Sequence, residues 1–237
     1  EAVVTALRDS GIDMIGLVLN DRGMDRAIAS GIGQINTVVA VSDTFSRENS
    51  GMSSDDAVAM SERVAARATA AGLRAGITLA AAFGCPFEGL VDPARVLAIA
   101  ERAAAAGFEE IALADTIGAA VPPQTEDLVA SVRAATGLPI RVHLHNSRNT
   151  GLANAVAALA GGASVLDAST GGIGGCPFAP GASGNIATED LVHMLDRMGV
   201  ATGVDVRLLL EAAELLETII GRPAPGMLRR SGVFPKS

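Results

Sequence analysis

Short aliphatic runs alternate along this chain with Ala-rich segments in which apolar residues recur every three or four positions. The first pattern is typical of buried strands and the second of amphipathic helices. The predicted strands are residues 14–19, 37–41, 75–79, 110–113, 140–143 and 164–167. Helices are predicted between them at 25–30, 54–71, 93–106, 124–136 and 150–160, and two more near 188–197 and 206–220.

Capping residues support these boundaries. Asp92 precedes Pro93, so an N-cap carboxylate stands before a proline at the first helical position. A glycine follows four of the predicted helices, where a left-handed C-cap would fall: Gly72, Gly107, Gly137 and Gly161.

Regular alternation of strand and helix predicts a parallel sheet, because each helix is the crossover that joins two parallel neighbours. A doubly wound open sheet would place a Gly-rich phosphate-binding turn after its first strand, and residues 20–23, Asn-Asp-Arg-Gly, do not form one. We therefore predict an α/β fold, a (β/α)8 TIM barrel, as a single domain over residues 1–237 that includes C-terminal helices at about 187–221.

Six strands do not close such a barrel, which has eight and usually needs about 250 residues. The chain begins at Glu1 without an initiator Met. Because unpaired parallel edges are unfavourable, we expect the first one or two strands of the barrel to lie upstream of Glu1. Residues 2–8 would then be the end of the second helix.

Composition narrows the class of protein. With 49% hydrophobic and 19% charged residues, the chain can build a core and is not intrinsically disordered. A charge balance of 18 − 26 = −8 argues against a nucleic-acid partner. No apolar run approaches the ~18 residues of a membrane span, so we expect no membrane partner. Two cysteines, Cys85 and Cys176, are too few for a disulfide-held secreted protein, which favours the cytoplasm.

The clearest chemical motif is Val-His-Leu-His-Asn at residues 142–146, at the end of the fifth predicted strand. Residues i and i+2 of a strand point to the same side, so His143 and His145 can reach one point at its carboxyl end, where barrel enzymes place their active sites. Two imidazoles there predict a divalent-metal site, completed by a carboxylate or amide oxygen from another strand. The alternative is two partly exposed histidines. His193 is assigned to a helix surface or the core.

A Gly- and Pro-rich loop at residues 171–185 follows the sixth predicted strand. Such a backbone can approach a ligand closely, and we interpret the loop as a lid. Its thiol, Cys176, is a candidate nucleophile, acid or base, with simple packing as the alternative. Asn185 is either the N-cap of the next helix or a metal ligand through its amide oxygen.

Five motifs occur in order over essentially the whole chain: GCPFEG at 84–89, DTIG at 115–118, HLH at 143–145, GGCPF at 174–178 and GASGNIATED at 181–190. Together they resemble the 3-hydroxy-3-methylglutaryl-CoA lyase family, and the Cys-containing loop is highly specific to it. The resemblance implies a barrel of the metal-dependent lyase and Claisen-condensing superfamily, with Mg²⁺ or Mn²⁺ at the carboxyl ends of the strands. It implies that His143, His145 and Asn185 bind this metal.

The same resemblance implies catalytic residues. Cys176 would be an acid–base group, Asp115 would lie in the active site and Glu189 would support the site. The alternatives are a turn carboxylate for Asp115 and a helix-capping role for Glu189.

The activity implied is cleavage of a 3-hydroxy-3-methylglutaryl-CoA-like thioester to acetyl-CoA and a 3-oxo acid, acetoacetate, as in leucine degradation. Coenzyme A is then part of the substrate, and a homodimer is expected from the resemblance. Such a cleavage needs a base, a Lewis acid and an acid, which these residues and a metal can supply. Two alternatives are a Claisen-type synthase acting on an acyl-CoA and a 2-oxo acid, and a non-catalytic acyl-CoA-binding barrel.

Two departures from the family concern the site. The family's opening strand carries an Arg-Asp pair, a catalytic cation and a metal ligand, and this chain has no match, since Arg8-Asp9 ends a predicted helix. Residues 146–149 are Asn-Ser-Arg-Asn where familiar lyases have Asp-Thr-Tyr-Gly, which would place the Arg148 guanidinium beside the metal and change the acyl group accepted. Cys85 and Cys176 are predicted to be free thiols, with a disulfide under oxidation as the alternative.

Overall fold

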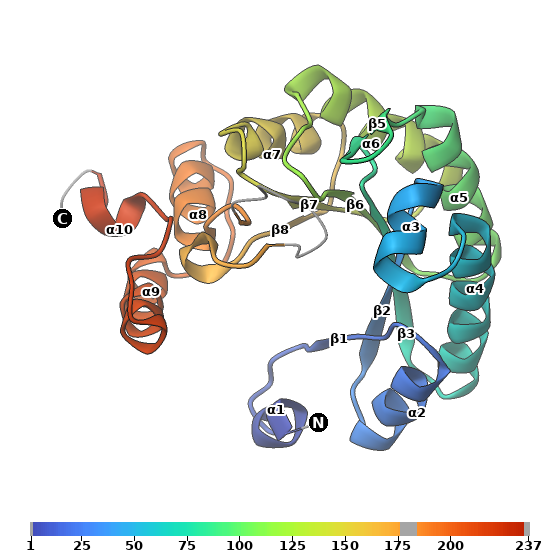
Figure 1. The fold of residues 1–237 in the computed structure, drawn as a ribbon. Coiled ribbons are helices and arrows are strands. Elements are labelled where there is room, and N and C mark those ends of the chain that lie inside the picture. Colours follow the sequence, from blue (N-terminus) through green and yellow to red (C-terminus); the bar gives the residue numbers. More distant parts are fainter. Residues whose placement is uncertain (1, 176–183, 235–237) are drawn as a thin grey trace.

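The computed structural model describes residues 2–175 and 184–234, and its centre is a curled six-stranded sheet (Figure 1). Neighbouring strands are parallel and follow the order β1-β2-β3-β6-β7-β8. The strands are β1 (Ile15–Leu17), β2 (Gln34–Ala40), β3 (Arg74–Ala80), β6 (Glu110–Asp115), β7 (Ile140–Leu144) and β8 (Val165–Asp167), and a short antiparallel hairpin consists of β4 (Gly84–Cys85) and β5 (Gly89–Leu90).

Helices cover the outer, convex side of this sheet (Figure 1). Those that follow successive strands are α2 (Asp21–Ser30), α3 (Asp43–Ser50), α4 (Ser54–Ala70), α5 (Pro93–Ala105), α6 (Pro122–Thr136) and α7 (Gly151–Ala160). The remaining helices are α1 (Ala2–Leu7), the 3-10 turn η1 (Thr170–Gly172), α8 (Thr188–Arg197), α9 (Val206–Ile220) and α10 (Leu228–Ser231). None of the helices in the described part of the chain is long and apolar enough to span a membrane.

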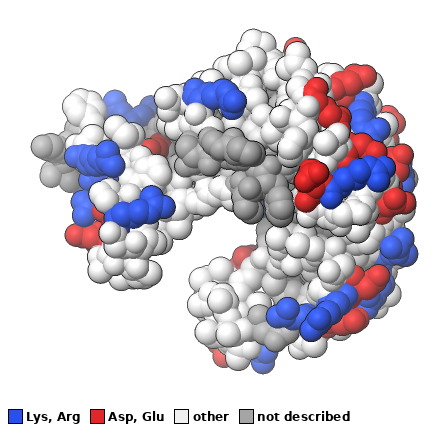
Figure 2. Space-filling view, in the orientation of Figure 1, with Lys and Arg blue, Asp and Glu red and all other residues white. Residues whose placement is uncertain are grey.

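This architecture confirms the predicted TIM-barrel class, since six parallel strands alternate with helices in barrel order around a curled sheet. Both edge strands, β1 and β8, are only three residues long, and Leu17 of β1 is exposed. Figure 2 shows the molecule hollowed between the part that carries α1 and the part that carries α9, with charged side chains gathered mainly on the opposite, outer side. The strands expected upstream of Glu1 lie outside this chain and stay a prediction.

Some local predictions were wrong. Helix α3 was missed because its sequence, DTFSRENS, has little apolar periodicity and buries only Phe45 and Ser46. Helix α2 begins at Asp21, four residues earlier than predicted, because the Asn20 side chain accepts a hydrogen bond from Gly23 N and caps it.

Gly161 is not a left-handed C-cap. Its backbone is right-handed, and Gly162 has the positive φ of 93° instead. A Cβ at Gly161 would lie 2.6 Å from the backbone oxygen of Glu126, so the glycine is needed for the close approach of α7 to α6.

The alternation of side chains along the strands separates core from site. On β7, Ile140, Val142 and Leu144 are buried in the core, whereas Arg141 and His143 point to the other face, inside the curl of the sheet. Each buried aliphatic side chain of this kind contributes about 1.5–3 kcal/mol to folding. The strand therefore holds His143 on a rigid element whose other face is anchored in the core.

Candidate active site at the carboxyl end of the sheet

The segment that follows the Gly-rich loop runs beside the end of β7. Ile186 N donates to Leu144 O at 3.1 Å, and Asn146 N donates to Gly184 O at 3.0 Å. His145 and Asn185 form an isolated antiparallel bridge between them. These backbone contacts bring Asn185 next to the two histidines although it lies 40 residues further along the chain.

The two histidines predicted from the sequence lie side by side. Their ring centroids are 5.2 Å apart with an edge-on interplanar angle of 66°. His145 is 5% exposed, and its burial, together with the neighbouring His143, lowers its pKa to about 4. His145 is therefore neutral at neutral pH, which is the form of imidazole that binds metal ions.

Two buried polar atoms of this group have no hydrogen-bond partner among the described residues. They are Nδ1 of His145 and Oδ1 of Asn185. The Asn185 amide is oriented by its Nδ2, which donates to Ile173 O at 2.9 Å, and this leaves Oδ1 as the open acceptor. Most buried polar atoms in proteins are satisfied. The described residues contain seven unpartnered ones, and these two belong to neighbouring residues of one cavity lining.

These atoms fit a hard divalent cation. Mg²⁺ and Mn²⁺ prefer oxygen ligands and accept imidazole nitrogen, and both His145 and Asn185 offer lone pairs without a competing donor. The alternative role of Asn185 as a helix N-cap is wrong, because α8 has its N-cap at Ala187. Among the described residues no group of three or more His, Cys, Asp or Glu could hold a metal, so the two imidazoles and one amide stay a predicted ligand set.

A carboxylate from the neighbouring strand, that of Asp167, faces His143. Asp167 Oδ2 lies 3.5 Å from His143 Nδ1, and its Oδ1 accepts a hydrogen bond from Arg141 Nη1 at 2.6 Å. Burial alone would raise the pKa of Asp167, but His143 and Arg141 beside it bring that pKa below its usual value. Asp167 is thus an anion at neutral pH.

These side chains line a cavity of about 500 Å³ inside the curl of the sheet. His143, His145, Asn185 and Asp167 form one wall. Asn36 of β2 and Thr78 of β3 line it too, and Asn36 Nδ2 donates to Thr78 Oγ1 at 2.8 Å. About half of the residues that line the cavity are polar, and they alternate with apolar ones such as Val38 and Phe45, so the cavity can bind a small molecule that has both kinds of group.

Asp115 lies one strand away and has different partners. Its carboxylate is fully buried and does not line the cavity. Oδ1 accepts from Ala119 N at 2.8 Å and Oδ2 from Ala120 N at 3.1 Å, so both oxygens hold the turn after β6. Burial raises the pKa of Asp115, although these hydrogen bonds oppose the rise. The contacts are those of a turn carboxylate, and its catalytic role stays a prediction.

Glu189 is buried in the first turn of α8, also outside the cavity lining. Its Oε2 accepts from Gly171 N at 3.0 Å, and its Oε1 has no partner among the described residues. Burial raises the pKa of Glu189. Through Gly171 it holds the beginning of the Gly-rich segment, which agrees with a supporting role that stays a prediction.

Three further residues singled out from the sequence are Cys176, Cys85 and Arg148. Cys176 lies outside the described residues. Cys85 is a buried free thiol that accepts a hydrogen bond from Ser42 Oγ at 2.9 Å, away from the cavity lining. Arg148 is not among the residues that line the cavity, and its Nη1 donates to the carbonyls of Ile117 and Gly118 at 2.7 and 3.3 Å, so its effect on the acyl group accepted stays a prediction.

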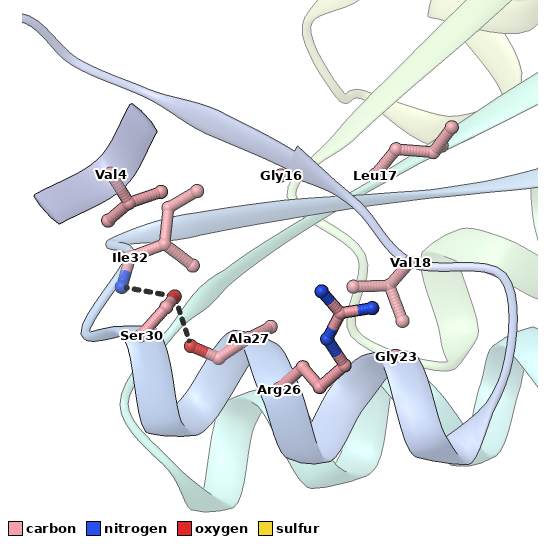
Figure 3. A pocket seen from close by; sticks show the side chains of 9 residues that line it. All are labelled: Val4, Gly16, Leu17, Val18, Gly23, Arg26, Ala27, Ser30 and Ile32. Atoms are coloured by element: carbon pink, nitrogen blue, oxygen red, sulfur yellow. Dashed lines mark hydrogen bonds between the residues drawn. The ribbon is translucent and has the colours of Figure 1, made fainter. Parts of the chain in front are cut away.

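A second, smaller cavity of about 200 Å³ lies between α1, β1 and α2 (Figure 3). Its walls are mostly aliphatic, with Val4, Leu17 and Ile32 among them, and Arg26 is the one ionisable residue in its described lining. It offers no set of groups for acid–base or metal chemistry.

Asp167, Asn36 and Thr78 line the cavity but were not predicted as site residues. Each is a polar residue among the aliphatic residues of a strand, a signal that was available. What the sequence could not give was which strands are neighbours and which of their faces turns inward.

Comparison with known proteins agrees with this geometry. The HMGL-like family model matches residues 2–216. The chain is 45% identical over 222 residues to (R)-citramalyl-CoA lyase of Chloroflexus aurantiacus, covering 93% of this chain and 70% of the relative. It is 39% identical to hydroxymethylglutaryl-CoA lyase YngG of Bacillus subtilis, covering 97% of this chain and 77% of the relative.

Among solved structures, the HMG-CoA lyase of Acinetobacter baumannii in complex with coenzyme A and 3-methylmalate has a TM-score of 0.90 and 35% identity, covering 95% of this chain and 74% of that one. The curled sheet with a site at its carboxyl end defines a barrel-type enzyme. The chain belongs to the HMGL-like family.

Proposed function

We propose that this protein is a divalent-metal-dependent carbon–carbon lyase that cleaves a 3-hydroxyacyl-CoA thioester to acetyl-CoA and an oxo acid. The observation that carries the proposal is the pair of unpartnered buried polar atoms, His145 Nδ1 and Asn185 Oδ1, in residues that line the cavity beside His143. Family membership and relatives named as CoA-thioester lyases support the reaction class.

The reaction breaks the bond between C2 and C3 of the thioester. The proton of the 3-hydroxyl group goes to a base, C3 becomes a carbonyl, and the bonding electrons form the thioester enolate, which takes up a proton at C2 to give acetyl-CoA. A bound Mg²⁺ or Mn²⁺ supplies Lewis-acid stabilisation of the developing negative charge on oxygen. His143, His145 and Asn185 would hold that ion in the cavity, and we assign the proton transfer to Cys176 by family resemblance.

Two thioesters are candidates for the substrate. 3-Hydroxy-3-methylglutaryl-CoA gives acetoacetate, as the resemblance predicts, and citramalyl-CoA, which is one methylene shorter, gives pyruvate. The second candidate is favoured by the 45% identity to (R)-citramalyl-CoA lyase, compared with 39% to the B. subtilis hydroxymethylglutaryl-CoA lyase. A binding pocket distinguishes substrates that differ by one methylene by only about 1–3 kcal/mol, so both belong in the test.

The test incubates the complete protein with each thioester, with Mg²⁺ or Mn²⁺, and measures acetyl-CoA, acetoacetate and pyruvate. We expect metal-dependent cleavage of at least one thioester and its loss in His145→Gln. Condensation of acetyl-CoA with a 2-oxo acid without cleavage would support the Claisen-type synthase instead. Binding of the thioester without any bond change would support the non-catalytic barrel.

The remaining expectations are part of this proposal. Coenzyme A enters as part of the substrate, which the bound coenzyme A of the A. baumannii enzyme supports. Assembly as a homodimer, a cytoplasmic location and a place in leucine degradation stay predictions.

A further inference from the structure

We propose that Asp167 is a positioning residue that fixes the tautomer of His143, with the proton on Nδ1 and the lone pair on Nε2. This inference deepens the proposed metal site and rests on it for its functional meaning. Its first readout, the tautomer itself, does not depend on catalysis or on metal.

The two oxygens of Asp167 contact different side chains. In the sheet register, His143 of β7 is paired with Asp167 of β8. Oδ2 of Asp167 faces Nδ1 of His143 at 3.5 Å, while Oδ1 accepts from Arg141 Nη1 at 2.6 Å. The carboxylate is therefore held between a guanidinium and an imidazole, and rotation away from His143 would give up the Arg141 contact.

Arg141 is itself anchored on its other side. Its Nε and Nη2 donate to Oε1 and Oε2 of Glu110 at 2.8 and 3.2 Å. The side chains of Arg141 and Glu110 are only 18% and 16% exposed. The order Glu110, Arg141, Asp167, His143 thus runs across three neighbouring strands, β6, β7 and β8, inside the curl of the sheet.

The hydrogen-bond donors and acceptors around Asp167 then determine the tautomer of His143. An ionised carboxylate only accepts hydrogen bonds and a guanidinium only donates them. With Oδ1 occupied by Arg141, Oδ2 can interact favourably with Nδ1 only if Nδ1 carries the hydrogen. Neutral His143 then has an unprotonated Nε2 on the opposite edge of its ring, available as a metal ligand in the cavity.

Asp167→Asn should reverse this arrangement. Arg141 cannot accept a hydrogen bond, so it takes the amide oxygen and leaves the amide NH₂ facing Nδ1 of His143. Nδ1 must then accept, and the hydrogen moves to Nε2, which blocks that nitrogen as a ligand. Glu110→Gln is the matched control, because it makes the same change of charge and size on the other side of Arg141 without touching His143.

The experiment measures histidine ¹⁵N chemical shifts of the metal-free protein in mildly alkaline buffer, with signals assigned by His143→Gln and His145→Gln. We expect the Nδ1–H tautomer of His143 in the unchanged protein, in Glu110→Gln and in Asp167→Glu, and the Nε2–H tautomer in Asp167→Asn. Titration with Mn²⁺ should show an affinity about 10- to 100-fold lower for Asp167→Asn than for Glu110→Gln.

An Nε2–H tautomer in the unchanged protein would overturn the proposal, and this result needs no variant to fold. It would also be overturned if Asp167→Asn kept the Nδ1–H tautomer and the Mn²⁺ affinity of Glu110→Gln. If the unchanged protein has the Nδ1–H tautomer but binds no Mn²⁺, the proposed metal-dependent function fails while the positioning of His143 stands.

Discussion

Two neighbouring strand ends use their polar residues in opposite ways. At the end of β6 the carboxylate of Asp115 is buried with both oxygens accepting backbone N–H groups of its own turn. At the end of β7 the buried Nδ1 of His145 and Oδ1 of Asn185 have no partner in the described structure. Buried polar groups that are hydrogen-bonded stabilise the fold, whereas unpartnered ones in residues that line a cavity are candidates for ligand binding.

This difference matters because Asp115, His145 and Asn185 all belong to the sequence motifs that resemble the lyase family. The motifs alone place Asp115, His145 and Asn185 in one site. Their contacts divide them into a residue that stabilises the turn after β6 and two cavity-lining residues whose buried polar atoms have no partner in the described structure. Substitutions at the two strand ends should therefore affect different measurable quantities.

The largest expected effect is at the end of β7. His145→Gln removes a ligand of the proposed metal site, and the loss of several kcal/mol of transition-state stabilisation should lower kcat/KM by about a thousandfold. Steady-state kinetics with saturating metal measures this, alongside urea unfolding to show that the variant is folded. His193→Gln, on α8 and outside the cavity lining, is the control and should keep native activity. Equal activity of the two variants would contradict the account.

Asp115→Ala should act mainly on stability. It leaves the half-buried N–H of Ala119 and the buried N–H of Ala120 without an acceptor, at a cost of about 2–4 kcal/mol in the free energy of unfolding. Asp115→Asn keeps one acceptor oxygen and should lose about half as much. Urea denaturation measures both. If Asp115→Ala kept native stability and lost activity, the division between the two strand ends would fail and the catalytic role would stand.

The low pKa of His145 predicts a pH dependence of folding. Because its pKa is about 4 in the folded protein and about 6.5 when exposed, the unfolded chain binds more protons between these values. Stability should therefore fall as pH drops from about 6.5 to about 4, by about 3 kcal/mol from this group, and be unaffected by it above 6.5. Unfolding of the metal-free protein measured over this range should show a weaker decline in His145→Gln, and identical slopes would show that His145 is not buried as described.

The smallest effect belongs to Arg148. Its guanidinium donates to Ile117 and Gly118 carbonyls at the surface, so Arg148→Ala should cost about 1 kcal/mol or less in stability. Because Arg148 does not line the cavity, the preference between the two thioesters should stay unchanged. A changed ratio of their kcat/KM values would show that Arg148 reaches the acyl group after all.

Features that depend on interactions between residues close in the sequence could be predicted, and features that depend on contacts between distant parts of the chain could not. The strands and most helices follow from local periodicity, and the His-x-His motif from the alternation of a single strand. The sequence could not show that Asp167 faces His143, because that contact depends on sheet register and on Arg141. Nor could it show that Asn185 is freed from capping, since this depends on a backbone bridge to His145.

The most direct test of the central claim is a crystal structure of the protein soaked with Mn²⁺, with anomalous diffraction used to locate the ion. We predict one peak in the cavity, about 2 Å from an imidazole nitrogen of each of His143 and His145 and from Oδ1 of Asn185. A well-ordered cavity with no such peak at saturating Mn²⁺, or with the ion bound elsewhere, would contradict the account.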